Sequence, residues 1–352
     1  MTAEGHWNDP VGIVSVGSFL PTRYLTAEEI AAAAGLPVAV VIEKLGIQGK
    51  HVGGADDHPN DMAVKAALDC LSHAPISAEE IDVVLCTTEE WKEYLAWTAG
   101  IDLAHQIGAR RAWAMDVHMR CATTVGAMKI AKDLMRADPA VRNVLIAGGY
   151  RLSDFIDFRN SRTSFLWNIG AGAGAMLLSR DWPYNEVLGS HIITDGSLSR
   201  SVLIPASGTV EHPTDDAVRS GRFMLDLVEP EKMKDRLNEV SLDNWLLCVD
   251  EALRKSGCTR ADLDYINMLL VKPSAHREVL NRLGMREEQS FYLGAIGHIG
   301  EQDAIFSIRE GLRTGRLRDG HLMAILAAGI GYVWAAALVR WGPIQRQENP
   351  CG

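Results

Sequence analysis

The sequence predicts an α/β fold made of two similar halves. Several short apolar runs are nearly continuous, which is typical of strands buried on both faces of a sheet; they include Val11–Phe19, Ile81–Thr87 and Val144–Gly149. Stretches with apolar residues at helical spacing lie between them. The order of elements within Val64–Thr87 recurs within Val249–Val271 as helix, turn, a Ser/Thr-x-x-Glu/Asp motif and a buried strand. A repeat of this length indicates a duplicated α/β half.

A second pair of segments supports the duplication. Gly170–Arg180 and Gly329–Arg340 each begin with spaced glycines and continue as an apolar strand that ends in arginine. We therefore expect two halves, residues 1–182 and 183–352, each with a mixed sheet covered by helices. The boundary is expected near Pro183.

Individual elements follow from local signals. Val11–Phe19 is expected to be the first buried strand, and Thr26–Ala34 a helix with Thr26 as its N-cap. A further helix is expected over Met62–Ser72. The segment Glu89–Gly100 alternates polar and aromatic residues, and we expect it to form a loop or short helix at the rim of a pocket.

Size and composition are those of a globular protein. The chain has 352 residues, of which 47% are hydrophobic and 23% charged. The formal net charge, 35 minus 45 or −10, argues against nucleic acid or an anionic membrane as the main partner. The six cysteines are scattered without a CxxC pair, so neither a metal site nor a disulfide framework is indicated. The polar N-terminus shows no signal peptide, and we expect free thiols in a reducing cytoplasm.

Two segments suggest misleading interpretations. Leu322–Val339 is uncharged over 18 residues, near the length of a membrane span. Because Gly329 and Gly331 interrupt its middle, two buried strands joined by a tight turn are the better interpretation. Gly170–Ala175, GAGAGA, is similar to a phosphate-binding loop, but Pro183 arrives too soon for the helix that such a loop should open. We expect a strand or a close-packed turn there.

The candidate nucleophile is Cys121. It follows a short apolar run, Ala112–Val117, and precedes a stretch with one apolar helical face that ends near Met135. The start of a helix offers unpaired N–H groups and partial positive charge, which favour the thiolate over the thiol. A lone cysteine is more often a packed side chain, but a strand–turn–helix setting is similar to other turns that bear nucleophiles.

Five segments spread along the chain carry a family resemblance. They are LGIQGKHV (Leu45–Val52), DVHMRCAT (Asp116–Thr123), GAGAGAMLL (Gly170–Leu178), TDGS (Thr194–Ser197) and GIGYVWAAALVRW (Gly329–Trp341). They resemble segments of the thiolase superfamily, with the closest likeness to β-ketoacyl-carrier-protein synthase III. The resemblance implies a duplicated fold in five layers, α-β-α-β-α. It also implies a homodimer and no cofactor, with acyl-CoA or an acyl carrier protein supplying a thioester substrate.

Two departures from that family bear on function. Condensing enzymes of the family carry a His in "HQAN" and an Asn in "GNTS", which hold the thioester oxygen while malonyl carrier protein loses CO2. Here Pro273, which has no side-chain donor, stands where the His is expected. His298 or Ile299 stands where the Asn is expected. Without two aligned donors the enolate loses several kcal/mol of stabilisation, which disfavours decarboxylative carbon–carbon bond formation.

The remaining reactive residues resemble the triad of synthase III-like acyltransferases from antibiotic pathways, which move an acyl group from a thioester to a hydroxyl. The resemblance implies Cys121 as nucleophile, His298 as base and Asp303 as the partner of that base. It also implies an oxyanion hole formed by the N–H of Cys121 and an N–H of the turn that holds Gly329 and Gly331. The plainer interpretations are that His298 is a loop residue and that Asp303 is simply favoured at a helix N-terminus.

Four residues are candidates for substrate contacts. Arg162 lies near the position of an Arg that, with a Trp, stacks the adenine of CoA in the family; Val40 replaces the Trp, which favours a carrier-protein donor. Arg120 flanks the nucleophile, and Trp97 lies in the aromatic segment, although packing roles suit both equally well. His276 follows the expected "HQAN" position by three residues and could replace its His in a condensing reaction.

These observations predict an acyltransferase that passes an acyl group through Cys121 to a small-molecule hydroxyl acceptor. The alternatives of the same broad class are a decarboxylative condensing enzyme and an enzyme that loads starter units for polyketides. A non-catalytic partner of an active synthase is a third possibility, but such subunits lack the cysteine that this chain retains.

Overall fold

The computed structural model describes residues 9–344, and nine of the strands there form one mixed sheet. Their order is β11-β12-β13-β8-β1-β7-β6-β4-β5. The strands of the first half are β1 (Val11–Phe19), β4 (Val83–Cys86), β5 (Trp113–Asp116), β6 (Asn143–Tyr150) and β7 (Gly172–Arg180). Those of the second half are β8 (Tyr184–Thr194), β11 (Tyr265–Met268), β12 (Leu322–Gly329) and β13 (Val333–Pro343). The two groups of strands meet where β1 pairs with β8 at Gly12 and Glu186.

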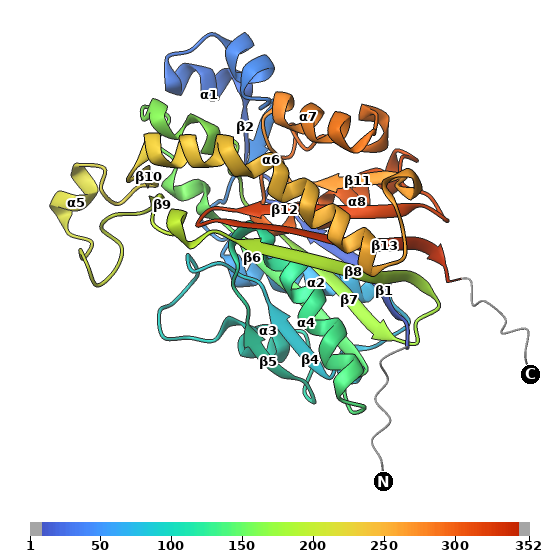
Figure 1. Ribbon diagram of the computed structural model, residues 1–352. Helices are drawn as coiled ribbons and strands as arrows, with labels where there is room; N and C mark the ends of the chain where they lie inside the picture. The colour runs from blue at the N-terminus through green and yellow to red at the C-terminus, as the bar shows by residue number, and fades with distance from the viewer. Residues whose placement is uncertain (1–8, 345–352) are drawn as a thin grey trace, which may run out of the picture.

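Helices cover and separate the two groups of strands (Figure 1). They are α1 (Ala27–Ala34), α2 (Pro59–Ser72), α3 (Ala99–Gln106), α4 (Thr123–Ala137), α5 (Asp215–Arg219), α6 (Pro230–Lys255), α7 (Pro273–Leu283) and α8 (Asp303–Arg313). Helix α2 packs on β1, β6 and β7, and α6 packs on β8 and β13. Helix α4 contacts both β6 and β8, while α8 contacts both β7 and β11. Helices α4 and α8 therefore lie between the two groups of strands, which is the five-layer arrangement that the resemblance implies.

The internal repeat is visible as matching structure. Ser77 and Thr259 each form a capping box at a short 3-10 turn, η2 (Ala78–Glu80) and η7 (Arg260–Asp262), just before β4 and β11. The Asp82 carboxylate then accepts the N–H of Asn143 at 2.9 Å, at the start of β6. The Asp264 carboxylate likewise accepts the N–H of Leu322 at 2.9 Å, at the start of β12. In each half the same motif thus ties one strand to the parallel strand beside it, β4 to β6 and β11 to β12.

Most expected elements are present. β1 has the predicted bounds, Gly172–Arg180 is a buried strand, and Leu322–Pro343 contains two antiparallel strands joined by a glycine turn. Helix α2 begins at Pro59 rather than Met62, because proline suits the first turn of a helix. Between residues 9 and 344 no helix is both long and apolar enough to cross a membrane.

Smaller elements flank the sheet. They are the two-stranded pairs β2 (Tyr24–Thr26) with β3 (Gly49–His51) and β9 (Val202–Leu203) with β10 (Asp226–Leu227), together with the π-helical turn η1 (Val40–Lys44). The cysteines of the described part, Cys70, Cys86, Cys121, Cys248 and Cys258, are free thiols as expected. Cys351 lies outside the described residues.

Candidate active site

The candidate nucleophile sits in a short turn between β5 and α4. Cys121 is the middle residue of the 3-10 turn η3 (Arg120–Ala122), and α4 follows at once from Thr123. The Thr123 hydroxyl accepts the N–H of Met119 at 2.8 Å and donates to the carbonyl of Arg120 at 2.5 Å. These two bonds hold the turn although Arg120 has a positive φ of 52°.

The second half supplies a base and a carboxylate to the same place. The Sγ of Cys121 lies 3.1 Å from Nε2 of His298, and Nδ1 of His298 lies 2.6 Å from Oδ2 of Asp303. His298 and Asp303 are buried, whereas Cys121 is half-buried. The structure thus brings together the three residues that the resemblance assigns as nucleophile, base and orienting carboxylate.

Backbone groups fix the orientation of the Asp303 carboxylate. Its Oδ2 also accepts the N–H of Leu270 and its Oδ1 accepts the N–H of Ile299, both at 2.7 Å. The N–H of His298 donates to the carbonyl of Asn168 at 2.8 Å. His298 is therefore held by its backbone and by its ring Nδ1, and the bond to Asp303 sets the ring orientation and favours a proton on Nδ1.

Charge coupling shifts the pKa of both reactive groups. Burial alone lowers the pKa of His298, but the Asp303 carboxylate and the Cys121 sulfur outweigh burial and raise it well above its ordinary value. Burial raises the pKa of the Cys121 thiol, and the neighbouring imidazole acts in the opposite direction. The sequence expectation that the start of the helix favours the thiolate is not met, because burial, the largest influence, leaves the pKa of the Cys121 thiol above its ordinary value. The thiolate at this site depends on His298.

The glycine turn after β12 leaves room over the nucleophile. A Cβ atom at Gly329 would lie 3.1 Å from the Cys121 nitrogen and 2.8 Å from the Cβ of Arg120. Gly331 has a φ of +120°, which L side chains rarely adopt. Glycine at 329 therefore keeps the N–H of Cys121 open to a developing oxyanion, as the expected oxyanion hole requires.

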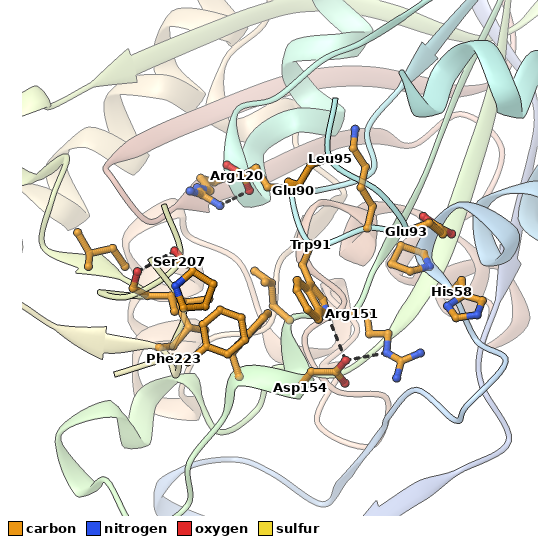
Figure 2. A pocket seen from close by; sticks show the side chains of 18 of the residues that line it. His58, Glu90, Trp91, Glu93, Leu95, Arg120, Arg151, Asp154, Ser207 and Phe223 are labelled. Atoms are coloured by element: carbon orange, nitrogen blue, oxygen red, sulfur yellow. Dashed lines mark hydrogen bonds and ion pairs between the residues drawn. The ribbon is translucent and has the colours of Figure 1, made fainter. Parts of the chain in front are cut away.

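A cavity of about 730 Å³ opens beside this turn. Figure 2 shows its wall, in which Trp91 and Phe223 face the space and Arg120 and Glu90 close one side. The ring of Trp91 lies 4.6 Å from that of Phe155, and its Nε1 donates to Asp154 at 3.1 Å. The pocket-rim expectation for residues 89–100 is confirmed for residues 90–95, which line this cavity.

The four candidate substrate residues have different surroundings. Arg120 lines the cavity and pairs with Glu90 at 2.6 Å. Trp97 packs on the ring of Tyr94 and against a core cluster, outside the residues that line the cavity. Such a contact indicates a packing role for Trp97.

The other two candidates are also engaged by the protein. The Arg162 guanidinium binds both oxygens of Asp226, at 2.8 and 2.6 Å. His276 is buried in α7 with its ring 5.3 Å from that of Tyr292. Burial, helped by the charge of Arg277, lowers the pKa of His276 to about 4. These contacts favour an ion-pair role for Arg162 and a neutral, packed role for His276.

The segment that follows β11 meets the triad at Leu270, three residues before Pro273. Pro273 packs against Gly46 near Tyr292, at the start of α7. Leu270, which lies two residues after β11, is the residue whose backbone meets Asp303. This segment therefore meets the triad through a backbone N–H, and Pro273 supplies no side-chain donor.

Sequence reasoning missed two buried carboxyl groups beside the nucleophile. Glu89 and Glu301 are each 1% exposed. Glu89 accepts hydrogen bonds from His118 at 2.9 Å and Arg120 at 3.1 Å. No pattern in the sequence marks Glu89 as buried. Glu301 looks like an ordinary acidic residue at a helix start.

Three potential metal-ligand atoms also gather here. Those of Glu89, Glu90 and His118 lie within 4.8 Å of one another. The guanidinium of Arg120, however, contacts both carboxylates. It supplies the positive charge that these carboxylates need and would repel a divalent cation, so the arrangement is an ion-pair network.

Two segments of the chain match models of a known family. Residues 115–196 match the model of 3-oxoacyl-[acyl-carrier-protein] synthase III, and residues 253–341 match the model of its C-terminal part. A β-ketoacyl-[acyl-carrier-protein] synthase III of Sulfurovum sp. (strain NBC37-1) is 26% identical over 326 residues, which cover 92% of this chain and 94% of that protein.

Solved structures show the same fold. A 3-oxoacyl-[acyl-carrier-protein] synthase III from Aquifex aeolicus superposes with a TM-score of 0.80 at 20% identity, covering 94% of this chain and all of that one. The priming β-ketosynthase of the R1128 polyketide pathway gives 0.81 at 24% identity, covering 95% and 97%. The chain therefore has the mixed α/β fold of these synthase III structures, and residues 115–196 and 253–341 match the two synthase III models.

Proposed function

We propose that this protein transfers an acyl group from a thioester to a hydroxyl acceptor through an acyl-Cys121 intermediate. The observation that carries the proposal is the continuous hydrogen-bonded chain of Cys121, His298 and Asp303, at 3.1 and 2.6 Å. A nucleophile, a base and a carboxylate that orients the base are the parts that acyl transfer to oxygen requires. The thioester and these side chains supply all of the chemistry, so the reaction needs no cofactor.

The first half-reaction forms the acyl-enzyme. The Cys121 sulfur attacks the acyl carbon and forms a carbon–sulfur bond, while the bond to the donor sulfur breaks. His298, which took the thiol proton, returns that proton to the departing thiolate of CoA or of an acyl carrier protein. The N–H groups of Cys121 and of the glycine turn hold the oxyanion, typically worth about 10²–10³-fold for a single donor.

The second half-reaction forms the ester. The acceptor hydroxyl approaches the acyl carbon, and His298 removes its proton as the new carbon–oxygen bond forms. The bond to the Cys121 sulfur then breaks and the thiolate is restored. Asp303 stabilises the imidazolium that forms at each stage. The net products are one ester and one free thiol.

Intact-protein mass spectrometry with acetyl-CoA tests the first half-reaction. Wild type should gain one acetyl group, and Cys121→Ala should gain none. Cys258→Ala, which removes another half-buried free thiol, is the matched control and should be acetylated like wild type. Addition of a panel of methyl glycosides should then discharge the acetyl group as an ester. Acetylation of Cys121→Ala at the wild-type level would refute the proposal.

Decarboxylative condensation is the second candidate, since the relatives that match this chain are named β-ketoacyl-[acyl-carrier-protein] synthase III. Release of CO2 from malonyl-CoA by the acetylated enzyme distinguishes the two reactions. We expect no release above that of Cys121→Ala, because Pro273, which stands where condensing enzymes of the family carry His, has no side-chain donor for the enolate.

A further inference from the structure

Two buried carboxyl groups near the sulfur each keep one oxygen without a partner. Oε1 of Glu89 and Oε2 of Glu301 have no hydrogen-bond partner among residues 9–344. Their other oxygens are bound: His118 and Arg120 donate to Oε2 of Glu89, and the amide of Gln302 donates to Oε1 of Glu301 at 2.9 Å. A buried acceptor left unpaired costs about 1–3 kcal/mol, and more if it is charged. Two such atoms in one site need an explanation.

Hydrogen bonds place Glu301 against the nucleophile turn. Glu301 belongs to the 3-10 turn η9 (Gly300–Gln302), between His298 and Asp303. Its carbonyl accepts the Thr124 hydroxyl at 2.7 Å, in the first turn of α4. The Gln302 amide also donates to the Thr87 hydroxyl at 2.8 Å, and Thr87 lies two residues before Glu89. These bonds link both carboxyl-bearing segments to the turn that holds Cys121.

The surrounding charges differ for the two carboxyl groups. Glu89 has two cationic partners, His118 and Arg120, whereas the hydrogen bond to the Glu301 side chain comes from a neutral amide. Burial raises the pKa of Glu301 well above its ordinary value, and the charge of Glu89 raises it further. Glu89 and His298 act on the Glu301 carboxyl group, and Glu301 in turn acts on Cys121 and Tyr150.

We propose that Glu301 is a positioning residue for Cys121, whose neutral carboxyl group holds its proton toward the unpaired oxygen of Glu89 and keeps a second negative charge away from the sulfur. A shared proton turns one of the two unpaired oxygens into a donor and satisfies both. The proposal rests on the proposed function only in taking Cys121 as the nucleophile.

The proposal predicts the direction in which ionisation of Glu301 changes the reactivity of the Cys121 thiol. When Glu301 loses its proton, a negative charge appears near the sulfur and opposes formation of the thiolate; the charges of Glu89 and Glu301 both raise the pKa of Cys121. Reactivity of Cys121 should therefore rise less steeply with pH once Glu301 ionises. Glu301→Gln keeps a donor toward Glu89 but has no proton to lose, so its reactivity should follow a single titration.

Alkylation of Cys121 by iodoacetamide in the free enzyme, followed by peptide mass spectrometry across pH, tests this consequence. Wild type and Glu301→Gln should react alike at low pH and diverge at high pH, with the variant roughly three- to tenfold faster, since one pKa unit changes the thiolate fraction about tenfold. Glu79→Gln, an exposed carboxyl, is the control and should match wild type. Superimposable profiles for wild type and Glu301→Gln would overturn the proposal.

Infrared spectroscopy provides an independent measurement. Wild type at pH 8 should show the carbonyl band of a buried protonated carboxylic acid, and Glu301→Gln should lack it. If Glu301→Gln does not fold, Glu89→Gln serves instead, because loss of the neighbouring charge should make the band disappear at a lower pH. Absence of the band from wild type at pH 8 would refute the proposal. Neither measurement uses an acyl donor or acceptor, so a failure of ester formation would leave this result unaffected.

Discussion

The two turns that meet at the active site occupy equivalent places in the two halves. The nucleophile turn, residues 117–122, ends in η3 and opens α4; the base turn, residues 297–302, ends in η9 and opens α8. Both helices lie between the same two groups of strands. The first turn carries a sulfur atom, whereas the second carries an imidazole with a carboxylate one helical turn beyond it. Duplication thus provided two facing helix starts, and their side chains determine which half attacks and which half moves the proton.

The charges of the two turns differ as much as their chemistry. The nucleophile turn has cations, His118 and Arg120, paired with Glu89 and Glu90, and both cations are about one-third exposed. Beside the base the carboxylates are buried: Glu301 of the base turn and Asp303, the first residue of α8, are each 1% exposed. A buried carboxylate interacts strongly with the groups it touches. Changes in the base turn are therefore expected to affect the reaction most, and changes in the charges of the nucleophile turn to affect mainly stability.

The largest effect is expected when the base turn loses its base. His298→Asn leaves an amide of similar size but removes the group that shuttles the proton, and transfer of acyl groups to alcohol should fall by about 10⁴-fold. Steady-state rates with acetyl-CoA and a methyl glycoside measure this loss. Wild-type turnover by His298→Asn would show that the second half does not supply the base.

A smaller loss is expected from Asp303→Asn. The amide preserves the shape of the site but no longer accepts the Nδ1 proton, so the imidazole takes the wrong tautomer and transfer should fall by about 10³-fold. Loss of this carboxylate also removes the strongest influence that raises the pKa of His298, so the midpoint of the pH–rate profile should move to lower pH. Asp319→Asn, on an exposed loop, is the control. An unchanged profile for Asp303→Asn would contradict the orienting role.

Gly329→Ala should slow formation of the acyl-enzyme by about ten- to a hundredfold, since its Cβ would crowd the Cys121 N–H and the Arg120 side chain. Single-turnover acetylation followed by mass spectrometry measures the rate. Gly320→Ala serves as a control with open space around its Cβ but a positive φ of 87°. If Gly320→Ala slowed acetylation and Gly329→Ala did not, the slower acetylation would come from backbone strain and not from reduced access to the Cys121 N–H.

The smallest effect is expected on stability. Burial lowers the pKa of His118, but Glu89 and Glu90 outweigh it and raise the pKa to about 9. Because the folded-state value lies above the unfolded value, about 6.5, this stabilisation is complete below pH 6.5 and is lost as pH rises through 9. His118→Gln should lower the free energy of unfolding by on the order of 1 kcal/mol at pH 6 and by much less at pH 10, after screening at a partly exposed site.

Urea unfolding at the two pH values measures this difference, with the exposed His105→Gln as the control for loss of a surface imidazole. A destabilisation by His118→Gln that is equal at pH 6 and pH 10 would show that the ion pairs of the nucleophile turn do not stabilise the fold.

The sequence alone determined the architecture, because strand burial, helix caps and the internal repeat are local patterns. Apolar runs and the positions of glycines were enough to predict β1 over Val11–Phe19 and the strand pair within Leu322–Pro343. Cys121 was named from its strand–turn–helix setting, whereas His298 was named through the family resemblance, which depends on motif positions. The sequence did not reveal that Glu301 is buried, that Trp97 packs on Tyr94 or that Arg162 pairs with Asp226, since burial and ion pairing depend on neighbours brought together by the fold.

Only the tertiary structure decided how the site works. The contact between Cys121 and His298 joins residues 177 positions apart, and the partner N–H groups of Asp303 come from separate loops. The tertiary structure also brought the backbone of Leu270 to the Asp303 carboxylate, and burial raised the pKa of the Cys121 thiol. Local sequence specifies secondary structure through short-range sterics and hydrogen bonds, whereas distances between charges and their removal from water arise only when the two halves pack together.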